Sequence, residues 1–248
     1  PRAPSVPPET REALAALGYL PTAPTDNPEE RGVTRREVGA WPGLNLYGSR
    51  HRASALLVDM GGRVVHRWAL DEPREPHRPW MHVEPSADGS ILAITKDHDV
   101  AEHAWDSSLR WRRRMRAHHD LAVHDDGRIF VLDRGPTRHR FRGEELFLLT
   151  DSIAILSPDG ELLERIDLFP LLERHVWRSR LARVAERAAE LSRAELLRPG
   201  GVADVLHVNS IELLERPIEG VAPQGAILLS SRALSRVLIL DPEGTEVL

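Results

Sequence analysis

The stretch ALLVDMGGRVVHRW at residues 55–68 decides the fold, because it contains two short apolar runs separated by a tight turn. Asp59 and the two glycines after Met60 supply the turn, since Asp and Gly adopt the backbone angles that hairpin turns require. The apolar run before the turn and the aliphatic run that ends at Trp68 are typical of β-strands. This segment therefore predicts a β-hairpin.

The same hairpin recurs along the chain. Further copies lie at residues 101–111 (AEHAWDSSLRW), 152–166 (SIAILSPDGELLERI) and 236–248 (RVLILDPEGTEVL). A second hairpin, which begins with His and turns at a polar residue and a Gly, alternates with it at residues 82–94, 119–132 and 207–231. Two alternating hairpins form a four-stranded antiparallel sheet, and sheets repeated every ~40–50 residues are typical of a β-propeller. We expect an all-β fold, a β-propeller with about three to four blades present.

A β-sandwich with coincidental turns is the alternative fold, and the constant internal order of the repeated sheets argues against it. Complete propellers close with about 4–8 blades, so we expect a fragment of a propeller that is truncated at its C-terminus. The last hairpin stops at Leu248, at the point where an earlier copy carries Trp68. Such a fragment would leave an unpaired strand edge.

Two segments depart from the repeat. Residues 1–32 form a polar, proline-rich lead-in, in which we expect a short helix that ends at Gly18. Within the propeller domain of residues 33–248, residues 171–197 have apolar positions at helical spacing and are followed by Pro199 and two glycines. We expect one amphipathic helix there, inserted between two strands, which could cap a face of the propeller or form a homo-oligomer contact.

The composition restricts the chemistry. The chain has 248 residues, a formal net charge of −5 and no cysteine, which excludes disulfides, thiolate nucleophiles and cysteine-based zinc sites. No apolar run approaches the ~20 residues that span a bilayer. The Arg-rich run at 110–116 is interpreted as a solvated strand or loop edge, so we expect no nucleic-acid partner. Nucleotide-binding, zinc-protease and serine-hydrolase motifs are absent from the sequence, and we expect no cofactor and no metal.

Histidines open the predicted inner strands of three successive blades. These openings are residues 80–82, 118–120 and 207–210. Inner strands line the central channel of a propeller, so residues far apart in sequence meet at its mouth. A single His is most often an ordinary polar residue, but three at matching repeat positions indicate a shared site. The His residues of this predicted site are His82, His118, His119 and His207.

Arg232 ends the strand that follows His207. An Arg beside two His and an Asn forms a positively charged pocket rich in hydrogen-bond donors, which suits a tetrahedral oxyanion such as sulfate or phosphate. The alternative is an ion pair between Arg232 and a surface carboxylate such as Glu243.

Several short motifs together resemble the arylsulfotransferase family, the arylsulfate sulfotransferases that do not use PAPS. They are GLNLY at 43–47, VDMGGRVVHRW at 58–68, HHD at 118–120, DVLHVNSIE at 204–212 and LLSSR at 228–232. The resemblance implies a propeller that is six-bladed when complete, with its site at the central channel. It also implies transfer of a sulfuryl group from a phenolic sulfate ester to a phenol, by a ping-pong route through a sulfohistidine.

Carried over by motif, His207, Asn209 and Arg232 match catalytic positions of the family. The His of HHD also matches one, and the choice between His118 and His119 stays open. Further residues expected to bind substrate are His82, Asp120 and Ser210.

The resemblance also assigns roles and a location. Arg232, Asn209 and His207 would hold the sulfuryl oxygens, and the HHD histidine would exchange a proton with the phenol. Asp120 could orient that histidine or cap a turn. The family's nucleophilic His follows the SSR motif, whereas no His follows His207 here. We therefore expect the nucleophile beyond residue 248, an inactive fragment, and a periplasmic or extracytoplasmic location.

Two other functions remain open. Three His with Asp120 or Glu84 could bind a divalent ion, as in metal-dependent hydrolytic propellers, although Arg232 would repel the cation. A non-catalytic interaction propeller would need only the repeats, but it leaves the His, Asn and Arg residues at the strand openings without a role.

Overall fold

The computed structural model describes residues 33, 37–48, 52–70 and 78–248. The chain divides into two compact units, one of Pro1–Asn45 with Val58–Val65 and the other of Leu46–Leu57 with His66–Leu248. The candidate site lies entirely in the second unit. The short helix expected within residues 1–32 falls outside the described residues.

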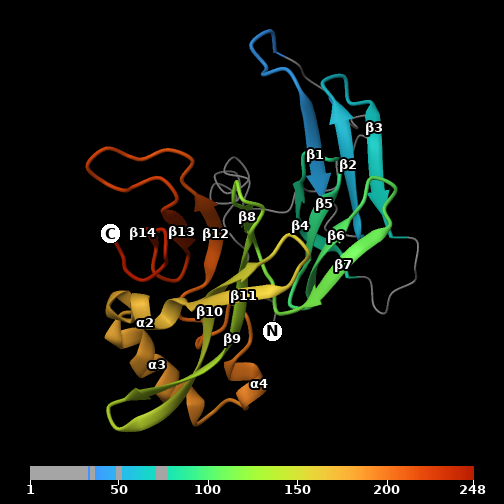
Figure 1. The fold of residues 1–248 in the computed structure, drawn as a ribbon. Coiled ribbons are helices and arrows are strands. Elements are labelled where there is room, and N and C mark those ends of the chain that lie inside the picture. The colour runs from blue at the N-terminus through green and yellow to red at the C-terminus, as the bar shows by residue number, and fades with distance from the viewer. Residues whose placement is uncertain (1–32, 34–36, 49–51, 71–77) are drawn as a thin grey trace. The chain divides into compact units, whose positions relative to one another are not determined.

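The described residues form four sheets, which follow one another in chain order (Figure 1). The first contains β1 (Leu44–Gly48), β2 (Ser54–Asp59) and β3 (Val64–Ala69). The second contains β4 (Trp80–Pro85), β5 (Ile91–Thr95), β6 (Asp99–His103) and β7 (Leu109–Arg114). The third contains β8 (Leu121–Val123), β9 (Ile129–Phe141), β10 (Glu144–Leu156) and β11 (Leu162–Asp167). The fourth contains β12 (Val208–Leu213), β13 (Ile227–Ser231) and β14 (Arg236–Leu240).

Within each sheet, neighbouring strands are consecutive in the sequence. The pairs of the second, third and fourth sheets are antiparallel. Successive antiparallel meanders of three or four strands are the blades of a β-propeller. The predicted all-β propeller fold, present in part, is confirmed.

The hairpins predicted from the repeat are confirmed, with one difference. Beyond β14, the expected second strand is reduced to an isolated bridge between Leu240 and Val247. The Asp241 carboxylate holds the intervening turn by accepting the amides of Thr245 at 2.6 Å and Glu246 at 2.7 Å.

The third sheet extends well beyond the length of an ordinary blade. β9 and β10 each have 13 residues, and their pairing continues from Ile129 and Leu156 to Phe141 and Glu144. A helical segment packs against this extension (Figure 1). It consists of α2 (Leu168–Leu172), the 3-10 turn η1 (Glu173–His175), α3 (Arg178–Ala188) and α4 (Arg193–Leu196).

The insertion is helical as predicted, but the single helix expected over 171–197 is wrong. Val176 and Trp177 have extended backbones, with ψ values of 121° and 130°, and an extended residue cannot continue a helix. A separate helix, α4, begins after Ser192. The Ser192 side chain accepts a hydrogen bond from the Glu195 amide, and the Glu195 carboxylate accepts one from the Ser192 amide. Separate short helices therefore fit around the extended hairpin.

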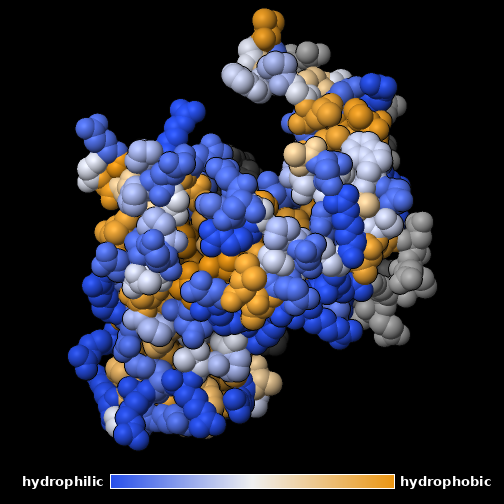
Figure 2. All heavy atoms as spheres, viewed as in Figure 1, coloured by the Kyte–Doolittle hydropathy of each residue, from blue (hydrophilic) through white to orange (hydrophobic). Residues whose placement is uncertain are grey.

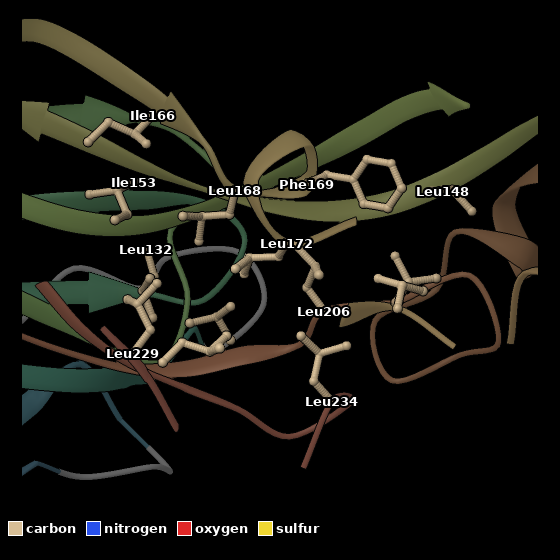
Figure 3. Close-up of a cluster of buried hydrophobic side chains, with 14 of the residues drawn as sticks. Leu132, Leu148, Ile153, Ile166, Leu168, Phe169, Leu172, Leu206, Leu229 and Leu234 are labelled. Carbon is tan, nitrogen blue, oxygen red and sulfur yellow. The ribbon is translucent and has the colours of Figure 1, made fainter. Parts of the chain in front are cut away.

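The largest apolar cluster joins the third and fourth sheets to these helices (Figure 3). It includes Leu132 and Ile153 from the third sheet, Leu168 and Leu172 from α2, and Leu206, Leu229 and Leu234 from the C-terminal part. Each fully buried Leu contributes about 1.5–3 kcal/mol of hydrophobic stabilisation. Because Leu206 immediately precedes His207, this cluster anchors the loop that carries the candidate site.

The insertion is amphipathic, as its sequence predicts. α3 buries Leu181 and Val184, and most of its other residues are exposed or half-buried. The surface at the lower left of Figure 2, over the extended hairpin and α3, is mostly hydrophilic. No helix in the described ranges is long and apolar enough to cross a membrane.

Gly160, in the turn between β10 and β11, is predicted to be essential for packing between the second and third sheets. Its φ is +80°, and an added Cβ would lie 2.3 Å from Cε3 of Trp111 on β7. Gly143, at the tip of the extended hairpin, has a similar φ of +90° but open space around it. We expect Gly160→Ala to lower the free energy of unfolding by about 2–4 kcal/mol, since steric overlap adds to backbone strain. Gly143→Ala should cost only the strain, about 1–2 kcal/mol. Equal losses in urea denaturation would contradict the close approach of Trp111.

Candidate active site

The first strand of each of the last three sheets begins with an irregularity of one residue. In β4, Trp80 pairs with Thr95 and His82 with Ile94, which leaves Met81 unpaired. The pairing of β12 with β13 skips Asn209 in the same way. Such β-bulges redirect side chains and are frequent next to active sites.

The same irregularity precedes β8. The His118 amide donates to the Leu132 carbonyl at 3.0 Å, and the Leu132 amide donates to the Asp120 carbonyl at 3.2 Å. His119 lies between these two bonds and is therefore the unpaired residue of the bulge. It has a left-handed φ of 58°.

The bulges correct the predicted register of the histidines. Equivalent positions in the three strands are Trp80, His118 and Val208 before the bulge, Met81, His119 and Asn209 at the bulge, and His82, Asp120 and Ser210 after it. His82 and His207 therefore do not match either histidine of HHD, and the expectation of three His at one repeat position is wrong. The sequence repeat could not show this, because a bulge adds an unpaired residue without changing the turn signals.

Three of the four predicted histidines nevertheless come together. The ring centroids of His118 and His119 are 5.2 Å apart, and those of His119 and His207 are 5.3 Å apart. His207, like His119, has a left-handed backbone, with φ at 46°. This conformation costs a residue other than Gly about 1–2 kcal/mol, and such strain is concentrated at functional sites.

His207 is oriented by a buried carboxylate three residues earlier. Its Nδ1 lies 2.6 Å from Oδ2 of Asp204, which also accepts the Gly200 amide at 2.7 Å. Burial raises the pKa of the Asp204 carboxyl, but the bonds from His207 and Gly200 outweigh burial and hold that pKa below its usual value. The ionised carboxylate therefore accepts the proton of His207 Nδ1, and Nε2 can donate to a ligand when the ring carries its second proton.

His118 is only 1% exposed and also meets a buried carboxylate. Its Nε2 lies 3.1 Å from Oδ1 of Asp151, an ion-pair contact. The Nδ1 atom of His118 has no hydrogen-bond partner among the described residues. The Nε2 atom of His118 likewise has no hydrogen bond of good geometry among the described residues, so its contact with Asp151 is electrostatic.

His119 is held in its neutral form. Its pKa is lowered to about 4, first by burial and then by the positive charges of His118, His207, Arg134 and Lys96. At neutral pH its imidazole therefore carries a lone pair that can accept a proton or contact an electrophile.

A buried ion pair joins the second and third sheets close to His119. Arg134 is 3% exposed, and its Nε and Nη2 donate to the two carboxylate oxygens of Asp97 at 2.7 and 2.6 Å. Burial raises the pKa of Asp97, but Arg134 outweighs this and lowers it. Such two-point pairs are geometrically specific, so this one fixes the wall of the site.

Asp120, which is expected to bind substrate, also forms contacts between strands. One oxygen accepts the amide of Ile211 in β12 at 3.1 Å, and the other lies 3.5 Å from Nε2 of His82. Glu84 also lies 3.5 Å from the same His82 nitrogen. Asp120 therefore connects the first strands of three sheets, and the described contacts do not include a bond that would orient His119.

Arg232 lies next to His207, since its amide donates to the His207 carbonyl at 3.1 Å. Arg232 and Asn209 are exposed, and Ser210 is half-buried. In the part of the chain that the structure describes, the Arg232 guanidinium forms no ion pair with Glu243 or with any other carboxylate. An exposed positive charge therefore lies beside His207.

Several residues of the site were missed from the sequence. They are Asp97, Arg134, Asp151, Arg180 and Asp204. Polar residues inside otherwise aliphatic strands were a usable signal for Arg134 and Asp151, because a buried charge needs a partner. Across the described ranges, no group of three or more His, Asp or Glu side chains is arranged to hold a metal ion.

A comparison with protein-family models gives one match, to the family described as Arylsulfotransferase (ASST), over residues 43–248. The chain belongs to the arylsulfotransferase family. The match includes all of the predicted site residues. Sulfuryl transfer is the class of chemistry that the name of this family describes.

Two solved structures are similar at low identity. The WD40 domain of Neurospora crassa Pan2 is 12% identical with a TM-score of 0.42, and the alignment covers 82% of this chain and 48% of that one. BamB from Moraxella catarrhalis is 10% identical with a TM-score of 0.38, with 83% and 48% covered. The arylsulfotransferase-family chain thus spans about half the length of each. A search of curated proteins gave no match.

The low pKa of His119 predicts a pH dependence of the stability of this arylsulfotransferase-family chain. Between pH ~6.5 and ~4 the unfolded state binds a proton at His119 that the folded state does not, so the free energy of unfolding falls on acidification. The variant His119→Asn lacks this contribution. Urea denaturation at several pH values should therefore show a weaker dependence in the variant over this range. Identical pH profiles for the two proteins would show that His119 is not held neutral.

Proposed function

We propose that the chain carries the sulfuryl-binding and proton-transfer residues of an arylsulfate sulfotransferase. The enzyme would move a sulfuryl group from a phenolic sulfate ester to a phenol, by a ping-pong route with a sulfohistidine intermediate. One observation carries the proposal. A histidine held neutral, His119, lies 5.3 Å between ring centroids from His207, which adjoins the exposed Arg232.

Arg232, Asn209 and His207 are suited to hold the sulfuryl oxygens. The guanidinium can bind two oxygens at once, and hydrogen bonds to a charged acceptor are stronger than those between neutral groups. As the sulfuryl group leaves one oxygen or nitrogen and bonds to the next atom, fixed donors stabilise the redistributed charge.

Between the two HHD histidines, we assign contact with the substrate to His119. His118 is buried and held at Asp151, whereas His119 is half-buried. A neutral imidazole can accept the proton of the phenol as the phenol oxygen forms its bond to sulfur and the bond from sulfur to the nucleophilic His nitrogen breaks. His118 would then orient His119 rather than react.

The nucleophilic His is not among the residues assigned above. The family order of motifs places it after SSR, and no His follows His207 in this sequence. The activity test therefore uses a chain that continues past Leu248 as well as the 248 residues themselves. Absence of turnover in the 248-residue chain, with turnover in the longer one, is the outcome that we expect.

The test is transfer of a sulfuryl group from 4-nitrophenyl sulfate to phenol without PAPS, measured by release of nitrophenolate and formation of phenyl sulfate. Arg232→Ala in the longer chain should reduce kcat/KM by about 10²–10³-fold, the usual cost of a lost transition-state donor. Arg216→Ala is the control, because Arg216 is exposed and lies beyond the opposite end of β12.

Two results would contradict the proposal. Folded longer protein that transfers no sulfuryl group from any aryl sulfate would argue against the function. An active Arg232→Ala variant with unchanged kcat/KM would argue against the role of Arg232 in binding the sulfuryl group.

A further inference from the structure

Arg180 of α3, in the helical insertion, forms hydrogen bonds with both loops of the candidate site. Its Nη2 donates to the backbone carbonyl of Asp204 at 2.9 Å, and its Nη1 donates to that of Ala233 at 3.4 Å. Asp204 orients His207, and Ala233 directly follows Arg232. We propose that Arg180 is a positioning residue that fixes the spacing between His207 and Arg232.

The two loops that Arg180 joins, which carry His207 and Arg232, also contact each other directly. Oγ of Ser231 donates to the Leu206 carbonyl at 2.5 Å, and the Ala233 amide donates to the same carbonyl at 3.2 Å. Arg180 adds a second connection on the side of the helix. A planar guanidinium presents donors at a fixed separation, so it can hold two carbonyls in a defined geometry, which the single ammonium group of Lys cannot do.

The backbone of α3 is rigid enough for this role. Leu181 and Val184 bury their side chains in the main apolar cluster, and Leu149 of β10 donates its amide to the Ala203 carbonyl at 2.8 Å. The donor and both acceptors are therefore held by packed elements rather than by free loops. Residues that support a site in this way are most effective on rigid elements.

The charge of Arg180 also matches an anionic substrate. Burial lowers the pKa of Arg180, Asp204 raises it, and Arg183 and Arg232 lower it again. The guanidinium nevertheless stays charged at neutral pH. Two guanidinium groups, Arg180 and Arg232, thus repel each other across the loop, and a bound sulfuryl group would relieve that repulsion.

This inference rests on the proposed function for its kinetic part, so the test has two readouts. In the longer active chain, Arg180→Gln should lower kcat by about 10–100-fold with a smaller change in KM, because misplaced groups mainly slow the chemical step. Arg180→Lys should recover part of that loss. Arg183→Gln, on the same helix and exposed, removes an equal charge and should change kcat by less than about twofold.

The second readout is the ¹H–¹⁵N spectrum of the His207 imidazole. Arg180→Gln should shift the Nδ1 resonance of His207, because the Asp204 loop moves, and Arg183→Gln should leave it unchanged. Melting temperatures show whether each variant is folded, and if Arg180→Gln unfolds, Arg180→Lys provides the comparison.

Unchanged kcat and unchanged His207 resonances in a folded Arg180 variant would overturn the inference. An equal effect of Arg183→Gln would also overturn it, since charge alone would then explain the loss. If the unsubstituted longer chain transfers no sulfuryl group, the proposed function fails, and the His207 spectrum still decides whether Arg180 positions the loop.

Discussion

Two carboxylates of the third sheet bind the backbone of the first strand of the fourth sheet, and the candidate site depends on these bonds. Asp151 accepts the amide of Val208 at 2.9 Å, and Asp120 accepts that of Ile211 at 3.1 Å. Hydrogen bonds to ionised groups contribute about 1.5–3 kcal/mol each. They fix β12 against the strands that carry HHD, and so place His207 beside His119.

Three carboxylates around the site each face a basic side chain. Asp97 binds Arg134, while Asp151 and Asp204 face His118 and His207. Among the described residues, Arg232 and Arg180 form no ion pair with a carboxylate, and Arg180 donates to backbone carbonyls instead. Burial and neighbouring positive charge together keep His119 neutral. A site with guanidinium groups that no described carboxylate pairs, and with one neutral imidazole, is suited to an anion whose reaction includes a proton transfer.

The sequence was sufficient to predict the blades, because hairpins depend on local turn chemistry and short apolar runs. It was not sufficient for the insertion, where Val176 and Trp177 are extended in the packed structure although the apolar spacing is helical throughout. Most site residues could be named from motifs. Their partners could not, because Asp151 meets Val208 across 57 positions of sequence. The register of His82 and His207 was also beyond prediction, since it depends on bulges that leave Met81 and Asn209 unpaired.

The most direct measurement of the central claim is binding of phenyl sulfate to the histidine cluster, followed by ¹H–¹⁵N spectra of the imidazoles. The account predicts that phenyl sulfate shifts the resonances of His119 and His207, that phenol alone does so much less, and that His124, at the far end of β8, does not respond. Saturable shifts confined to His119 and His207 would establish the cluster as an aryl sulfate site. Unchanged resonances at both histidines, with the protein folded and phenyl sulfate at millimolar concentration, would contradict it.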